Sequence, residues 1–123
     1  MAPKSVILIG LPAPKPEDEI PPGLDREKLV NDINSIQADL DAGGYDALSL
    51  LVGPDDAVAE FTERLKEKKW DFVCIGAGIR LSPKQFLLFE QLINVAHEHA
   101  PQAKLCFNTS PSSSLEAVKR WDV

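Results

Sequence analysis

The chain has 123 residues, a formal net charge of −6 at pH 7, and 44% hydrophobic and 26% charged residues. This length predicts one domain over residues 1–123, large enough to bury a core without a metal or a disulfide. The acidic balance argues against binding to nucleic acid or to an anionic membrane. No run approaches the roughly 20 apolar residues of a membrane helix, and a signal peptide has no room before the first strand. We therefore expect a cytoplasmic protein.

Short apolar runs rich in β-branched residues predict strands. They cover Ser5–Gly10, Ala47–Val52, Phe72–Ile75 and Lys104–Asn108. The third run is apolar throughout and is followed by glycine, as in a central parallel strand covered on both faces. Cys74 and Cys106 lie inside two of these runs and are interpreted as small buried hydrophobes. A disulfide between them requires neighbouring strands, and a reducing compartment disfavours it.

Helical patterns alternate with these strands. The first helix is predicted from Asp25, as N-cap, to Gly43-Gly44, with an apolar stripe at Leu29, Ile33, Ile36 and Leu40. The second is capped by Asp55 or Asp56, has an inner face of Val58, Phe61 and Leu65, and ends in Lys66, Lys68 and Lys69. The third spans 83–99 after a Ser82 cap and Pro83. The last follows a capping box at Ser113–Glu116, with Leu115, Val118 and Trp121 inward.

Alternation of parallel strands and helices predicts an α/β fold, a three-layer αβα sandwich on a four-stranded parallel sheet. The expected strand order is 2-1-3-4, flavodoxin-like or Rossmann-like, with the first and last helices on one face. Ligands of such sheets bind beyond the carboxyl ends of the strands, near the point where the strand order reverses. We therefore expect any site at that edge.

Loops that converge on this edge carry glycine, hydroxyl and amide residues and one cation. The candidate ligand-binding residues are Gly10, Pro12, Gly76, Ala77, Gly78, Arg80, Asn108, Thr109 and Ser110. Backbone N–H groups near glycine and the guanidinium of Arg80 suit a phosphate or carboxylate. We therefore predict a site for a small anionic metabolite or nucleotide. The alternative is that these residues only form turns and that Arg80 pairs with Glu17, Asp18 or Glu19.

The segment 12–24 is rich in proline and acidic residues, so it is neither helix nor inner strand. It is long for a connection from strand to helix, which is usually about 2–6 residues. Two interpretations stay open: a lid over the predicted site, or a neutral insertion.

Familiar catalytic and cofactor motifs are missing from the sequence. Gly76-Ala77-Gly78 is half of a dinucleotide fingerprint, because Leu81 occupies the third position, and the chain has no P-loop. No aspartate ends the first or third strand as a phosphoryl acceptor. His97 and His99 lie two residues apart on a helix and make a poor metal pair, so no metal site is predicted. The cofactor is left unassigned.

Two further hypotheses concern other parts of the chain. Leu87 falls on the polar side of helix 83–99, next to Phe86. This indicates a non-catalytic interaction module that forms a homodimer through that helix. A small isomerase or lyase-type enzyme is the other alternative, with Asp55 or Glu90 as its carboxylate.

Several segments resemble a group of small bacterial and fungal Rossmann-like α/β proteins of unknown function. They are Cys74–Arg80, Leu87–Glu90, Leu92–Asn94, His97–Pro101 and Cys106–Thr109. The resemblance implies a single α/β domain over nearly the whole chain and carries over no catalytic residues. It emphasises Glu90, Asn94 and His97, which share one polar stripe of the third helix, and leaves open whether that stripe is functional.

Overall fold

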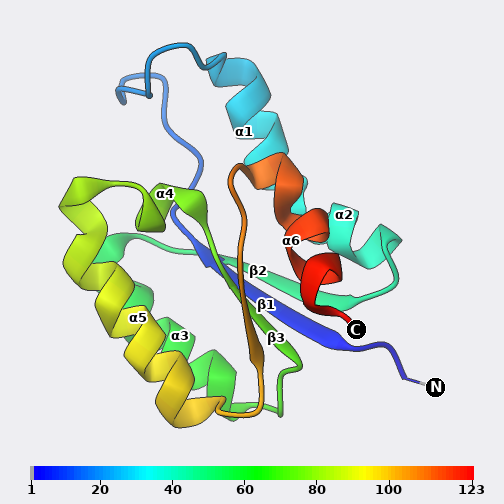
Figure 1. Cartoon of the computed structure of the whole chain (residues 1–123). Coiled ribbons are helices and arrows are strands. Elements are labelled where there is room, and N and C mark those ends of the chain that lie inside the picture. Colours follow the sequence, from blue (N-terminus) through cyan, green and yellow to red (C-terminus); the bar gives the residue numbers. More distant parts are fainter. Residues whose placement is uncertain (1) are drawn as a thin grey trace.

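A parallel sheet forms the centre of the protein. The structure, a computed structural model, describes residues 2–123. The strands are β1 (Ser5–Gly10), β2 (Asp46–Leu51), β3 (Phe72–Ile75) and β4 (Lys104–Phe107). All neighbouring strands are parallel and the order is β2-β1-β3-β4, as predicted (Figure 1). The strand boundaries agree with the prediction to within one residue.

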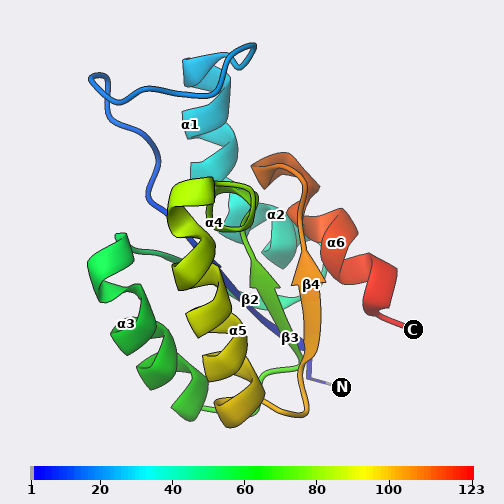
Figure 2. The ribbon, with the colours of Figure 1, turned by 60° about the vertical axis from the view of Figure 1, so that its left-hand side comes forward.

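Helices cover both faces of the sheet and complete the predicted three-layer sandwich (Figure 2). The helices are α1 (Arg26–Asn34), α2 (Ile36–Ala42), α3 (Pro54–Lys66), α4 (Ala77–Arg80), α5 (Phe86–His99) and α6 (Ser114–Trp121), with 3-10 turns η1 (Pro83–Gln85) and η2 (Pro111–Ser113). α3 and α5 pack on one face, and α2 and α6 on the other. Within residues 2–123, every helix is too short or too polar to cross a bilayer.

Alternation along the strands divides the core into two clusters. On the α3/α5 face, Ile7, Ile9, Val73 and Ile75 meet α3 and α5 side chains such as Phe61. On the opposite face lie Val6, Leu8, Phe72, Cys74, Cys106, Ile36, Leu40 and Val118. Cys74 and Cys106 are register partners on adjacent strands and are both free thiols. Burial raises the pKa of Cys74 to about 12 and that of Cys106 to about 11, so both are inert at neutral pH.

The prediction of one continuous first helix was wrong, because the helix is interrupted. It breaks at Ser35 into α1 and α2, and the Ser35 hydroxyl donates to the Asn31 carbonyl at 2.7 Å. Such a bond back into the preceding turn favours bending. Asp25 caps α1 as predicted, because its carboxylate accepts from the Glu27 N–H at 3.1 Å. No residue of α1 is buried, so the break lets α1 project beyond the sheet.

The predicted start and end of the second helix also need correction. Gly53 is the N-cap of α3 and Pro54 its first residue, so neither Asp55 nor Asp56 caps it. Proline at this position leaves both aspartates inside the first turn, where the helix dipole favours them. α3 ends at Lys66, and Lys68 instead forms an ion pair with Asp46 at 2.9 Å.

Two helix starts differ from the prediction because 3-10 turns precede them. Ser82 makes no side-chain cap bond, and α5 begins only after η1. The capping box joins Ser110 and Ser113 at η2, rather than Ser113 and Glu116. Trp121 is 48% exposed, not inward. The Trp121 carbonyl accepts from Lys104 of β4, which is an edge strand of the sheet in the described residues.

Candidate functional site

The turns after β1 and β3 are in contact at the carboxyl end of the sheet. The Gly76 N–H donates to the Ile9 carbonyl at 2.9 Å. A Cβ added at Gly76 would lie 3.6 Å from the Gly10 Cα atom. The place where the strand order reverses is therefore filled by main chain. Open polar groups lie to one side of it, between β3 and β4.

The glycine-rich turn after β3 is a single helical turn, α4, instead of an open loop. The Gly76 carbonyl accepts from the N–H groups of Ile79 and Arg80. Gly78 is exposed, and a Cβ at this position would meet nothing within 4 Å. Its N–H has no hydrogen-bond acceptor within residues 2–123. The packing of the fold therefore does not require glycine at position 78, and its amide is open to solvent.

Asn108 joins this turn to the last helix. Its side chain is only 2% exposed. The Oδ1 atom accepts from the Ala77 N–H at 2.8 Å, and the Nδ2 atom donates to the Ser114 hydroxyl at 3.0 Å. Both ends of the amide are thus used inside the protein, and Asn108 fixes α4 relative to α6. Asn108 therefore helps to position α4, the element that carries Arg80.

Arg80 extends from α4 across the end of β4. Its Nη2 atom donates to the Asn108 carbonyl at 2.8 Å, and its Cζ atom lies 5.8 Å from the centroid of the Phe107 ring. The Nε atom is buried without a hydrogen-bond partner. In the described part of the chain, no carboxylate forms an ion pair with Arg80. The alternative pairing with Glu17, Asp18 or Glu19 is not observed.

The acidic segment 12–24 is attached to α1 instead. The Arg26 guanidinium donates to the Lys15 carbonyl at 2.7 Å and to the Asp18 carbonyl, and the Lys15 N–H donates to the Asp18 carboxylate at 2.9 Å. Figures 1 and 2 show this segment and α1 standing beyond the carboxyl ends of the strands. A hollow of about 530 Å³ lies between the segment and α1, bounded by Pro14, Pro16 and Val30 among others. Closure of this segment as a lid stays a prediction.

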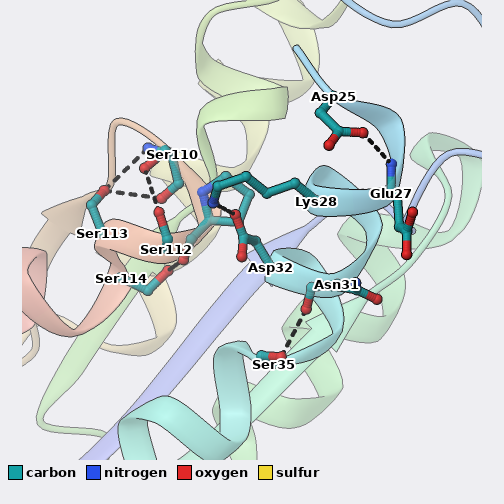
Figure 3. A network of polar contacts seen from close by, with 11 residues as sticks. Asp25, Glu27, Lys28, Asn31, Asp32, Ser35, Ser110, Ser112, Ser113 and Ser114 are labelled. Carbon is teal, nitrogen blue, oxygen red and sulfur yellow. Dashed lines mark hydrogen bonds and ion pairs between the residues drawn. The ribbon is translucent and has the colours of Figure 1, made fainter.

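Thr109 and Ser110 belong to a turn whose hydroxyls bond to one another (Figure 3). The N–H groups of Thr109 and Ser110 both donate to the Ser113 hydroxyl, at 3.0 and 3.1 Å. The Ser110 and Ser112 hydroxyls are 3.3 Å apart. α1 runs beside this turn, with an ion pair between Lys28 and Asp32 at 2.6 Å. These contacts account for most polar groups of the turn.

The structure thus brings some of the candidate residues together and separates others. Gly76, Ala77, Arg80 and Asn108 form one hydrogen-bonded group, and Gly10 lies against it. Thr109 and Ser110 follow directly but face η2, and Pro12 is exposed at the start of the long segment.

Two residues of this group were missed by sequence reasoning. Ser114 is buried and accepts from Asn108, and the Phe107 ring supports Arg80. Alternation along β4 indicates the face of Phe107, whereas nothing in the sequence distinguishes Ser114 from its serine neighbours.

The other candidate residues form no hydrogen bond or ion pair with this group in the described part of the chain. Asp55 and Glu90 are exposed, and the Asn94 side chain donates to the Glu90 carbonyl at 3.0 Å. His97 is exposed, and His99 lies 3.8 Å from the Glu98 carboxylate. Over residues 2–123, no three His, Cys, Asp or Glu side chains are arranged to hold a metal ion.

The chain matches no protein-family model, no curated protein and no solved structure in the comparisons made with them.

Proposed function

We propose that the protein binds a small anionic metabolite or nucleotide at the carboxyl end of the sheet, with Arg80 as the main cationic contact. One observation carries this proposal. The Arg80 guanidinium has no carboxylate partner within residues 2–123, although the chain has a net charge of −6. A cation kept from counter-ions in an acidic protein favours an external anion, since a charge-assisted hydrogen bond contributes about 1.5–3 kcal/mol.

The surroundings of Arg80 support binding by limiting its motion. The Asn108 carbonyl takes one hydrogen bond from Nη2, and the Phe107 ring lies beneath the guanidinium. The Nη1 atom has no partner in the described residues. An arginine held in place loses less side-chain entropy on binding than a free one. The Gly78 N–H, two residues away on α4, has no acceptor within residues 2–123 and is the second donor that we propose for the same anion.

Thermal unfolding in the presence of defined anions tests the proposal. We expect inorganic phosphate or AMP to raise the melting temperature above that in chloride at equal ionic strength, because a ligand that binds only the folded state stabilises it. Arg80→Ala should abolish this rise, and Arg80→Lys should retain part of it.

Arg64→Ala is the matched control, since Arg64 lies on α3 and forms an ion pair with Glu67 at 2.7 Å. This variant should keep the full rise. A rise that survives in Arg80→Ala, or one that is lost equally in Arg64→Ala, contradicts the proposal.

A second candidate function is the homodimeric interaction module acting through helix 83–99. Three large apolar side chains near the start of α5 favour it: Leu81, Phe86 and Leu87 are 62%, 61% and 67% exposed. Such a cluster is unusual on a monomer, where exposed apolar residues are scattered singly. Light scattering at increasing concentration should then show a dimer that Leu87→Glu disperses. A monomer at every concentration counts against this function.

A further inference from the structure

The two edge strands of the sheet, β2 and β4, differ in how their outward-pointing N–H groups are bonded. Along a strand, the backbone N–H and C=O of successive residues point alternately toward one neighbour and toward the other side. On β2, Asp46 donates to the Lys4 carbonyl at 2.9 Å, so Ala47 and Ser49 point outward. Their N–H groups are both occupied, by the Asp41 carboxylate at 3.2 Å and the Gln37 amide oxygen at 3.0 Å. Side chains from α2 therefore occupy these two outward donors of the β2 edge, while the outward carbonyls of Ala47 and Ser49 have no partner within residues 2–123.

On β4, by contrast, the outward N–H groups have no partner within residues 2–123, and only one outward carbonyl is bonded. Lys104 donates to the Asp71 carbonyl at 3.0 Å, toward β3, so Leu105 and Phe107 point outward. The Arg120 guanidinium confirms this direction, because its Nη2 atom donates to the Phe107 carbonyl at 3.1 Å. Both groups of Leu105 and the N–H of Phe107 have no partner within residues 2–123. An open edge of this kind is a template for a further strand.

Side chains on the two sides of this edge differ in character. On the α5 side lie Leu105, which is 36% exposed, and Phe107, whose ring centroid is 6.1 Å from that of Phe89. On the α6 side lie Lys104 and Arg120, both exposed. A strand added here would place alternate side chains over an apolar surface and over a cationic one.

The two cations on the α6 side form hydrogen bonds to backbone carbonyls. Lys104 donates to the Trp121 carbonyl at 2.9 Å, and Arg120 to the Phe107 carbonyl. Neither forms an ion pair with a carboxylate in the part of the chain that the structure describes. Lys104 still lies near enough to Asp122 to help lower the pKa of that carboxyl, so Arg120 is the less compensated of the two cations. Charge complementarity therefore selects an acidic partner rather than a basic one.

We infer that the β4 edge binds an extended acidic segment of a partner protein, in which apolar and acidic residues alternate, as a fifth strand. The backbone of the partner would bond to Leu105 and Phe107, and its acidic side chains would face Lys104 and Arg120. Main-chain bonds give such additions their affinity, and the alternate side chains give specificity. This surface shares Phe107 with the Arg80 site, because the Phe107 ring also lies 5.8 Å from the Arg80 Cζ atom.

The test uses a fluorescein-labelled peptide of alternating valine and glutamate, flanked by glycine and serine, and measures fluorescence anisotropy. We expect saturable binding that weakens with salt. A peptide with lysine in place of glutamate should bind about tenfold more weakly or not at all. A peptide N-methylated at every residue should also fail, because neither of its edges then offers a backbone N–H donor. No binding, or equal binding of these three peptides, overturns the inference.

Substitutions in the protein locate the binding. Leu105→Pro removes an outward N–H that the sheet does not use, and edge strands tolerate proline there. It should abolish binding, and Lys104→Glu with Arg120→Glu should weaken it about tenfold. Ala47→Pro on the opposite edge is the control and should bind normally. If Leu105→Pro does not fold, the N-methylated peptide decides. Self-association of the protein that Leu105→Pro removes would assign the edge to a second copy and overturn the inference.

Discussion

The two ends of the sheet differ in how their charges are balanced. At the amino end, Lys4 forms an ion pair with Asp122 at 2.5 Å, and the Tyr45 hydroxyl donates to the same carboxylate at 2.6 Å. Nearby, Lys68 forms an ion pair with Asp46 at 2.9 Å. At the carboxyl end, the polar and aromatic contacts of the Arg80 side chain within residues 2–123 are with the Asn108 carbonyl and the Phe107 ring. Four charged side chains at the amino end are thus paired with one another, whereas the Arg80 guanidinium has no carboxylate partner within residues 2–123.

This difference separates residues that maintain the fold from residues available for binding. Paired groups at the amino end have little left to offer a ligand. At the carboxyl end, the buried Asn108 amide maintains the geometry, and the Arg80 Nη1 atom and the Gly78 N–H have no hydrogen-bond partner within residues 2–123. The position of these unbonded donors agrees with the general tendency of parallel sheets to bind ligands at their carboxyl ends.

Alkaline unfolding is the largest effect that we expect. Burial and the hydrogen bond to Asp122 raise the pKa of Tyr45 to about 12, and burial raises the pKa of Cys74 to about 12 and of Cys106 to about 11. The folded state therefore retains protons that the unfolded chain releases first. Stability is complete below the unfolded pKa values of about 8.5 for Cys and 10 for Tyr, and it is lost as the pH rises through 11 to 12.

Urea unfolding between pH 7 and pH 11.5 measures this loss. Tyr45→Phe should make the decline in the free energy of unfolding shallower, because it removes the contribution of the Tyr45 hydroxyl. The contribution of the two thiols remains. A free energy of unfolding that stays constant over this range contradicts the assignment of all three groups as buried and protonated.

Asn108→Ala should be the most damaging single substitution at the carboxyl end. It removes two hydrogen bonds and leaves the Ala77 N–H without a partner, so we expect a loss of about 2–4 kcal/mol in the free energy of unfolding. Asn94→Ala is the control: Asn94 is exposed and bonds only within its own helix, so its loss should stay within about 0.5 kcal/mol. Equal losses in urea titrations would remove the bridging role of Asn108.

Asp71→Ala makes the corresponding change at the amino end. The Asp71 carboxylate accepts from the Ser5 N–H at 2.8 Å and lies 3.4 Å from its hydroxyl. We expect a loss of about 1–2 kcal/mol, because water reaches this exposed side chain and partly replaces it. Asp71→Asn should lose less, since an amide oxygen still accepts. Calorimetry measures both losses. The prediction is contradicted if Asp71→Asn proves less stable than Asp71→Ala.

Arg80→Ala should have the smallest effect on stability when no anion is added. The bond to the Asn108 carbonyl and the contact with Phe107 are offset by the cost of partly burying an unpaired guanidinium. We expect a change of no more than about 1 kcal/mol in the free energy of unfolding. A loss as large as that of Asn108→Ala would mark Arg80 as a structural residue and remove the contrast between the two ends.

Much of the fold was predictable from local pattern, and the site only in outline. The strands, their order and the inert thiols follow from apolar runs such as Phe72–Ile75 and from the crossover rules. The break at Ser35 was not predictable, because the apolar stripe continues through it and one hydroxyl bond marks the bend. α4 was not predicted either, because the glycines of the turn after β3 have low helix propensity. Tertiary contacts override that propensity there.

The topology also predicted which turns would meet, and Gly76, Ala77, Arg80 and Asn108 do form one group. The direction of the Asn108 side chain was beyond prediction. It depends on the placement of α4 and α6, two elements that are distant in the sequence and whose starts the 3-10 turns shift.

A titration with inorganic phosphate, followed by amide and arginine Nε–H signals in ¹H–¹⁵N spectra, tests the central claim most directly. We predict saturable shifts at Gly78, at the Arg80 side chain and at neighbouring Thr109, with the signals of Lys4 and Asp122 unchanged. Shifts concentrated at the amino end, or no saturable shift near Arg80, would contradict the account.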